Sequence, residues 1–130
     1  KESSYSLPSI MEKLEAMQGR MTLYSGNDDM VYPLLALGAE GVISVVSNLA
    51  PRYMADMVQS YQQGDLAKSL DLQVKSLPLV RALFSEVSPI PCKFAMEQMG
   101  LCGGELRLPL IPAGEDTRRQ LLAAMKDLGL

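Results

Sequence analysis

The segments YSGND (Tyr24–Asp28) and GVISV (Gly41–Val45) decide the predicted fold of this chain. Each is a short run of strand-forming residues that reaches a Gly or Ser corner, and each is followed by apolar residues at helical spacing. The chain therefore alternates strand, loop and helix, as βαβ units do. Because the loops at the carboxyl ends of parallel strands converge on one opening, functional residues are expected at 25–28 and 44–48.

The two predicted strands are Met21–Tyr24 and Gly41–Val45. The second is almost entirely apolar, which predicts a strand buried on both faces of a parallel sheet. Two strands cannot form such a sheet alone, since both faces and both edges need cover. The chain also begins at Lys1 without an initiator methionine. We therefore expect an amino-terminal part of the sheet in a longer protein, with ordinary processing as the alternative explanation of the first residue.

Apolar residues three and four positions apart predict a series of helices, three of them capped by Ser6, Asp28 and Asp65. Pro78 is expected to bend the helix that contains it. Strands alternate with helices only in the first part of the chain, so a boundary is predicted near Gly64. The predicted helices are Ser6–Gln18, Asp29–Leu37, Pro51–Gln63, Leu66–Val87, Pro89–Met99 and Gly114–Leu128, with a loop at Leu101–Ala113.

Composition excludes several classes of function. The 130 residues carry a net charge of −3 with 12 scattered basic residues, which argues against a nucleic-acid surface. Histidine is absent, so a His-based triad and a His-ligated metal site are excluded within this chain. Cys92 and Cys102 fit no zinc-site spacing and are interpreted as free thiols, with a single disulfide as the alternative. No apolar run in the sequence is long enough to span a bilayer, and a cytoplasmic protein is expected.

Several short motifs, taken together and in order, resemble the carboxyl-terminal portion of the dihydrodipicolinate synthase family. No single motif is specific, but the set covers nearly the whole chain in the order and spacing of the family. The motifs are Lys1–Ser4, Ser25–Asp28, Gly41–Val45 with Asn48 and Pro51 beyond it, Ser88–Lys93 and Leu106–Leu110.

The resemblance implies an α/β fold, namely the carboxyl-terminal part of a (β/α)8 TIM barrel followed by an all-helical carboxyl-terminal domain. Residues 1–63 would run from the end of strand six to helix eight, and residues 64–130 would form the helical domain. Members of the family are commonly homodimers or homotetramers. In the helix that starts at Leu66, the apolar stripe is expected to pack against the barrel or a neighbouring subunit. That stripe consists of Leu66, Leu70, Val74, Leu77, Val80 and Phe84.

The resemblance also implies the chemistry of a class I aldolase-type lyase. Such an enzyme condenses pyruvate with aspartate semialdehyde through a lysine Schiff base, in the first committed step of lysine and diaminopimelate biosynthesis. Neither a cofactor nor a metal is implied. The Schiff-base lysine falls on Lys1, the glycine near the pyruvate carboxylate on Gly26, and the isoleucine whose main chain lines the site on Ile43. Asn27 stands where many members have aspartate.

The residues taken alone allow other interpretations. The fold and the Schiff-base lysine are shared by sibling pyruvate-dependent aldolases, such as N-acetylneuraminate and keto-deoxy-sugar-acid lyases, which differ in the aldehyde. A non-catalytic interaction module or a remnant of an enzyme is a further alternative. Without the family, Lys1 is a solvated terminal lysine, Ser25–Asp28 is a turn with a helix cap, and Asn48 either caps a helix or contacts substrate.

We also predict that the isolated chain is inactive. A lysine nucleophile must be neutral, and with a reference pKa of about 10.4 only about one lysine in 2,000 is neutral at pH 7. Burial is the usual means of raising that fraction. The catalytic tyrosines, the threonine proton relay and the entrance arginine of the family lie upstream of Lys1, in the missing amino-terminal barrel half. Lys1 itself is expected to be a disordered terminal residue without support from a strand.

Overall fold

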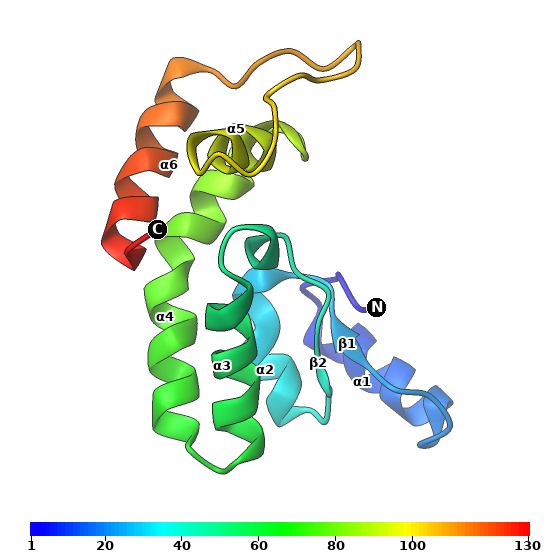
Figure 1. The fold of residues 1–130 in the computed structure, drawn as a ribbon. Coiled ribbons are helices and arrows are strands. Elements are labelled where there is room, and N and C mark those ends of the chain that lie inside the picture. The colour runs from blue at the N-terminus through cyan, green and yellow to red at the C-terminus, as the bar shows by residue number, and fades with distance from the viewer.

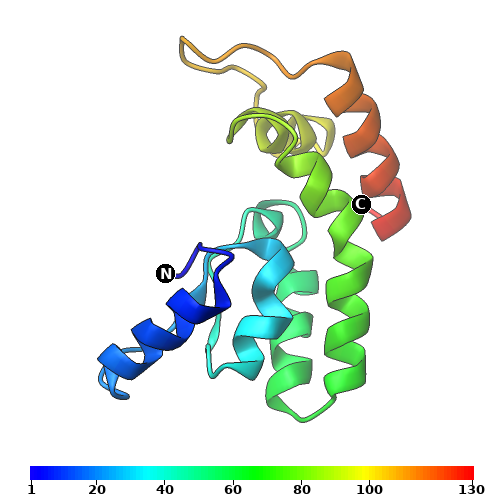
Figure 2. The same ribbon diagram turned by 180° about the vertical axis from the view of Figure 1, so that it is seen from behind.

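A small parallel sheet and a larger set of helices make up the chain, in a computed structural model that describes residues 1–130 (Figure 1). The views in Figures 1 and 2 show α2 and α3 between the strands and α4, with α5 and α6 at one end of α4. In chain order the elements are α1 (Leu7–Met17), β1 (Tyr24–Ser25), the 3-10 helix η1 (Asp28–Met30), α2 (Val31–Ala36), β2 (Gly41–Val42), the 3-10 helix η2 (Val46–Asn48), α3 (Pro51–Gln62), α4 (Leu66–Leu83), α5 (Ile90–Gln98) and α6 (Glu115–Leu128).

The sheet is parallel, as the sequence predicts, but its strands are shorter than predicted. Tyr24 of β1 is in register with Gly41 of β2, and Ser25 with Val42. Met21 is exposed and stands outside the sheet, so the predicted start of the first strand is wrong. Flanking backbone hydrogen bonds extend the pairing by one residue at each end, from the Glu40 amide to the Leu23 carbonyl and from the Ile43 amide to the Ser25 carbonyl.

The prediction that Gly41–Val45 is buried on both faces is also wrong for this chain. Only Gly41–Val42 is strand, and the Ile43 side chain is 51% exposed. The physical reason is that β1 is the only strand paired with β2, so β2 is an edge strand here. After Ser44 the backbone turns at once into η2, where the Ser47 amide donates to the Ser44 hydroxyl.

Two of the three predicted helix caps form. The Ser6 hydroxyl accepts from the Ser9 amide at the start of α1, and the Asp65 carboxylate accepts from the Lys68 amide at the start of α4. The helix α1 ends at Met17, one position before the predicted Gln18, because Gln18 itself adopts a left-handed conformation with φ 48°. The helix α4 ends at Leu83 rather than Val87 and contains Pro78, and both views show its last turns leaning toward α5, as a bend at the proline predicts (Figures 1 and 2).

The packed face of α4 differs from the predicted apolar stripe. Leu66, Leu70 and Val74 are exposed, whereas the buried face carries Ser69 and Gln73 in the same turns. Hydroxyl and amide groups are buried without large cost only where they find hydrogen-bond partners, and both side chains do so. Within this chain the inner face of α4 is therefore partly polar, and the packing of the apolar stripe against the barrel or a neighbouring subunit stays a prediction.

Two groups of buried apolar side chains hold the helices together. The larger core has 16 buried residues drawn from both sides of position 63, among them Met57, Leu79 and Leu121. The smaller core joins α1 to α2 through Ile10, Leu23, Leu34 and Ala39. Both cysteines are free thiols, which confirms that interpretation. None of the helices combines the length and the apolarity needed to cross a membrane.

Replacing Leu121 by alanine is expected to lower the free energy of unfolding by about 2–5 kcal/mol, because the side chain is fully buried in the larger core. Urea titration followed by circular dichroism measures this change. Leu122→Ala is the matched control, since that side chain is on the same helix and 47% exposed. Equal destabilisation by the two variants would contradict the core assignment.

Candidate functional site

Three backbone segments meet at the ends of the strands. Glu2 forms a parallel bridge with Ser25, in which the Glu2 amide donates to the Tyr24 carbonyl at 2.9 Å and the Gly26 amide donates to the Glu2 carbonyl at 2.6 Å. On the other side of β1, the Ile43 amide donates to the Ser25 carbonyl at 2.8 Å. The predicted site residues therefore lie beside three neighbouring parallel segments. Lys1 precedes Glu2, Gly26 follows β1 and Ile43 follows β2.

The support of Lys1 differs from the prediction. We predict an unsupported terminal residue, but the bridge between Glu2 and β1 fixes the backbone beside Lys1. The Lys1 side chain is exposed to solvent within this chain. The site thus has a positioned lysine backbone, while nothing in these 130 residues removes the lysine amine from water.

Gly26 allows the lysine side chain to lie directly on the backbone. A Cβ atom built at Gly26 would lie 2.7 Å from Lys1 Cε and 2.9 Å from Lys1 Cγ, and it would collide with the Ser3 hydroxyl. Carbon atoms in contact are normally about 3.5–4.0 Å apart, so any side chain at this position would displace the lysine. The need for glycine here is a close approach of two segments rather than a positive φ angle.

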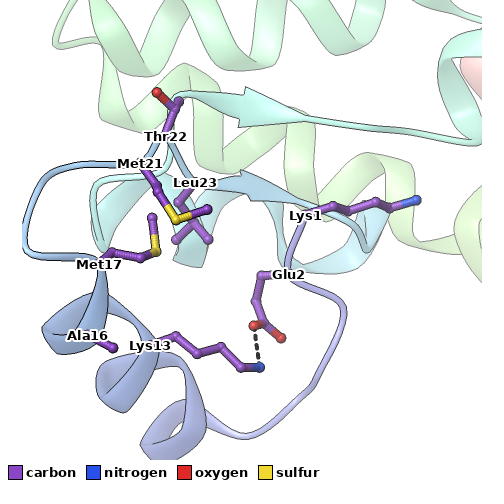
Figure 3. Close-up of a pocket in the computed structure, with 8 residues that line it drawn as sticks. All are labelled: Lys1, Glu2, Lys13, Ala16, Met17, Met21, Thr22 and Leu23. Atoms are coloured by element: carbon purple, nitrogen blue, oxygen red, sulfur yellow. Dashed lines mark hydrogen bonds and ion pairs between the residues drawn. The ribbon is translucent and has the colours of Figure 1, made fainter.

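Glu2 is a site residue that the sequence analysis missed. Its carboxylate is 4% exposed, lies 2.6 Å from Lys13 Nζ on α1 and accepts from the Ser4 amide at 2.5 Å. Hydrogen bonds from Lys13 and Ser4 lower the pKa of the Glu2 carboxyl to about 2. Figure 3 shows Lys1 and Glu2 pointing to opposite sides of their segment, as neighbours in an extended backbone do. Glu2 therefore ties the lysine segment to α1 from the side opposite the lysine amine.

A cavity of about 340 Å³ lies on the Glu2 side of this segment. In Figure 3 the Lys1 amine points away from Lys13 and Met17, two of the cavity's lining residues. The cavity therefore does not contain the reactive atom of the predicted site. Its lining consists of Lys1, Glu2, Lys13, Ala16, Met17, Met21, Thr22 and Leu23.

The loop after β1 is held by its own side chains and by the segment that precedes α1. Ser25 is fully buried, and its hydroxyl donates to the Asn27 carbonyl at 2.8 Å. The Asn27 amide nitrogen Nδ2 donates to the Ser3 carbonyl at 2.9 Å. An ionised aspartate could not make this second bond, because it has no donor. Asn27 stands where many members of the family have aspartate. Here its side chain anchors the loop after β1 to the segment that precedes α1.

Asp28 does not cap the helix that follows it, so that prediction is wrong. It lies inside η1, it is 2% exposed, and its Oδ2 atom accepts from the amides of Val45 at 2.9 Å and Val46 at 3.3 Å. The Val45 and Val46 amides lie at the start of the loop after β2. Backbone N–H groups that are removed from water need hydrogen-bond acceptors, and the Asp28 carboxylate is the acceptor here. The carboxylate therefore joins the two strand-end loops to each other.

Asn48 does not cap the helix α3, which removes one of its two alternative roles. Its Nδ2 atom donates to the Val45 carbonyl at 3.0 Å, and the residue before α3 is Ala50, which makes no side-chain cap. The exposed side chain thus closes η2 locally.

Gln73 is the second site residue that the sequence analysis missed. From α4, its Nε2 atom donates to the Asp28 carbonyl and its Oε1 atom accepts from the Tyr32 amide, both at 2.9 Å. The only signal in the sequence is a polar residue among apolar neighbours in a long helix, which is too common to identify a contact more than forty positions away.

The structure contains no group of three or more His, Cys, Asp or Glu side chains that could hold a metal ion. Burial raises the pKa of the Cys92 thiol, and the nearby Cys102 and Asp28 raise it further. A thiol in that condition is a poor nucleophile. Cys92 is therefore not a candidate nucleophile in this site.

Known proteins match the whole chain. The sequence profile of the Dihydrodipicolinate synthetase family matches residues 1–128. The 4-hydroxy-tetrahydrodipicolinate synthase of Lachnoclostridium phytofermentans is 45% identical over 131 residues, which cover 100% of this chain and 44% of that protein.

Solved structures match equally well. The crystal structure of dihydrodipicolinate synthase from Thermotoga maritima superposes with a TM-score of 0.94 at 42% identity, over 99% of this chain and 45% of that one. The enzyme from Acinetobacter baumannii, solved in complex with pyruvate, gives a TM-score of 0.91 at 37% identity, over 99% of this chain and 44% of that one.

The chain thus spans less than half the length of the relatives it matches. Within that span the family profile, the sequence identity and the arrangement of strands and helices agree from the first residue onward. The chain belongs to the dihydrodipicolinate synthetase family.

Proposed function

We propose that the protein to which this chain contributes is a lyase that condenses pyruvate with aspartate semialdehyde, with Lys1 as the Schiff-base residue. The observation that carries the proposal is the Lys1 side chain lying against the Gly26 backbone at the carboxyl ends of neighbouring parallel segments. That is where catalytic side chains gather in parallel α/β folds. The pyruvate complex of the Acinetobacter baumannii relative supports the choice of the first substrate.

The same proposal places this chain in a barrel. Residues 1–63 would supply the last strands of a (β/α)8 barrel and residues 64–130 its carboxyl-terminal helical domain. The spatial order of the Glu2 segment, β1 and β2, all parallel, and the free edge of β2 support this assignment. The family resemblance further leads us to propose a cytoplasmic homodimer or homotetramer.

In the proposed reaction the lysine amine attacks the keto carbon of pyruvate, and the keto oxygen leaves as water to give an imine. Loss of a proton from the pyruvate methyl group gives an enamine, whose carbon attacks the aldehyde carbon of aspartate semialdehyde. The aldehyde oxygen takes up a proton. The amine of the semialdehyde then attacks the imine carbon, which closes the ring and releases the lysine amine.

Gly26 and Ile43 contribute backbone rather than side chains to this site. A glycine leaves room for a small carboxylate beside the lysine, and the Ile43 main chain is held by its bond to Ser25 at 2.8 Å. The isolated chain leaves the Lys1 side chain exposed to solvent. Activation would then depend on burial by the upstream barrel strands, and the isolated chain would be inactive.

Borohydride reduction in the presence of pyruvate tests the proposal. In the full-length protein we expect one pyruvate-derived adduct that peptide mapping assigns to Lys1, and we expect none on the 130-residue chain alone. Lys1→Arg should abolish the adduct, because a guanidinium forms no imine under these conditions. An adduct on Lys13 instead, or a full yield of adduct on the isolated chain, would contradict the proposal.

Gly26→Ala in the full-length protein is expected to lower kcat/KM by about 100-fold, because a displacement of about 1 Å at a reacting group has an effect of that size. The added Cβ would meet Lys1 Cε at 2.7 Å. Gly41→Ala is the matched control, since a Cβ there meets only the Tyr24 ring at 3.4 Å. Steady-state kinetics distinguishes the two variants, and equal losses would argue against a specific approach of lysine to Gly26.

The Glu2–Lys13 pair predicts a pH dependence of stability. The pKa of Glu2 is lowered from 4.5 to about 2 in the folded state, so its stabilising contribution is complete above pH 4.5. It should be lost as the pH falls from 4.5 toward 2, when the carboxylate takes up a proton.

Urea unfolding across this pH range should therefore show a steeper loss of stability for the natural sequence than for Glu2→Gln. Glu12→Gln, which removes an exposed carboxylate on α1, should leave the slope unchanged. A natural-sequence slope equal to that of Glu2→Gln would show that the pair does not stabilise the fold.

A further inference from the structure

A single buried side chain connects the helical part of the chain to the strand-end loops. Gln73 projects from the middle of α4 and is 4% exposed. Its Nε2 atom donates to the Asp28 carbonyl at 2.9 Å, and its Oε1 atom accepts from the Tyr32 amide at 2.9 Å. Both ends of the side-chain amide are thus used on one short stretch of backbone.

That stretch includes the start of a helix. The Tyr32 amide belongs to the first turn of α2, where backbone donors have no acceptor within the helix. The residue before α2 provides no side-chain cap. Gln73 therefore caps α2 from a different element, and in doing so it fixes the position of η1 against α4.

The fixed stretch in turn holds both loops of the proposed site. The Asp28 carboxylate accepts from the Val45 and Val46 amides, which begin the loop after β2. Two residues before Asp28, the Gly26 amide donates to the Glu2 carbonyl, and Gly26 contacts the Lys1 side chain. A hydrogen bond to Asp28, the backbone of residues 26–28 and the close approach of Gly26 to Lys1 therefore connect α4 to the lysine.

We infer that Gln73 is a positioning residue for the Schiff-base lysine, so that the helical carboxyl-terminal part sets the geometry of the strand-end loops. This inference rests on the proposed function. Only a side chain of this length with one donor and one acceptor satisfies both backbone groups. Glutamate lacks the donor, leucine lacks both groups, and asparagine is one methylene shorter.

The variants that test the inference are Gln73→Glu and Gln73→Leu in the full-length protein. Gln73→Glu keeps an acceptor for the Tyr32 amide but places a carboxyl group against the Asp28 carbonyl, whereas Gln73→Leu removes both polar groups without adding a charge. Ser69→Ala is the matched control, because Ser69 is fully buried one turn earlier on α4 and donates to the Met57 carbonyl at 2.9 Å. That bond ties α4 to α3 without reaching the loops.

Two readouts are needed. The first is the rate of pyruvate trapping by borohydride at Lys1, measured per folded protein, together with kcat and KM for pyruvate. We expect both Gln73 variants to slow trapping by about 10- to 100-fold, as misplacement of a reacting group does, and Ser69→Ala to stay within about twofold of the natural sequence. The second is hydrogen exchange at the Tyr32, Val45 and Val46 amides, which should quicken in the Gln73 variants alone.

Each other outcome has a distinct meaning. Trapping at the natural rate in both Gln73 variants, or equal slowing in Ser69→Ala, would overturn the positioning role and leave the proposed function intact. Failure of the natural full-length protein to form any adduct at Lys1 would overturn the proposed function itself. Unchanged exchange at Val45 and Val46 in the Gln73 variants would show that α4 does not hold these loops, whatever the catalytic result.

Discussion

The backbone pairing between Glu2 and β1 is the constraint on which the rest of the site depends. The Gly26 amide donates to the Glu2 carbonyl at 2.6 Å, which sets the lysine segment beside the loop after β1. On the outer side, the buried Glu2 carboxylate is held by Lys13. Because neighbouring side chains in an extended segment point to opposite sides, fixing Glu2 against α1 also fixes the direction in which Lys1 leaves the backbone. The Glu2–Lys13 ion pair therefore orients the Lys1 side chain indirectly, through the backbone of Glu2.

Polar side chains, more than apolar ones, give the inner face of α4 its specificity. Ser69 donates to the Met57 carbonyl, and Gln73 connects to Asp28 and Tyr32. Each of these groups would cost about 1–3 kcal/mol if it were buried without its partner, so a shifted or rotated α4 would be strongly disfavoured. Apolar contacts alone would tolerate such a shift more easily. The helical part is thus locked to the strand-end loops in one arrangement.

Local signals in the sequence predict the elements better than they predict their packing. Ser6 and Asp65 cap the helices that they were expected to cap, because capping depends on residues three positions away. Asp28 carries the same local signal, but its carboxylate binds the loop after β2 instead. The exposure of Ile43 has a similar cause, since burial of a strand depends on neighbours that no local pattern describes. Ordered family motifs predict Lys1, Gly26 and Ile43 as site residues, whereas the contacts of Glu2 and Gln73 depend on the three-dimensional fold.

Positioning and activation of the proposed lysine come from different parts of the protein. Within this chain, Gly26 and Glu2 place the Lys1 side chain, and Gln73 holds the loop beneath it. The side chain nevertheless remains exposed to solvent, whereas a lysine nucleophile is usually activated by burial. Placement alone therefore cannot produce a nucleophile, and burial alone would leave the amine without a defined direction of attack. In the proposed function, covalent catalysis at this lysine requires both contributions at once, so a chain that covers 44% of its relatives would hold the geometry of the site without its reactivity.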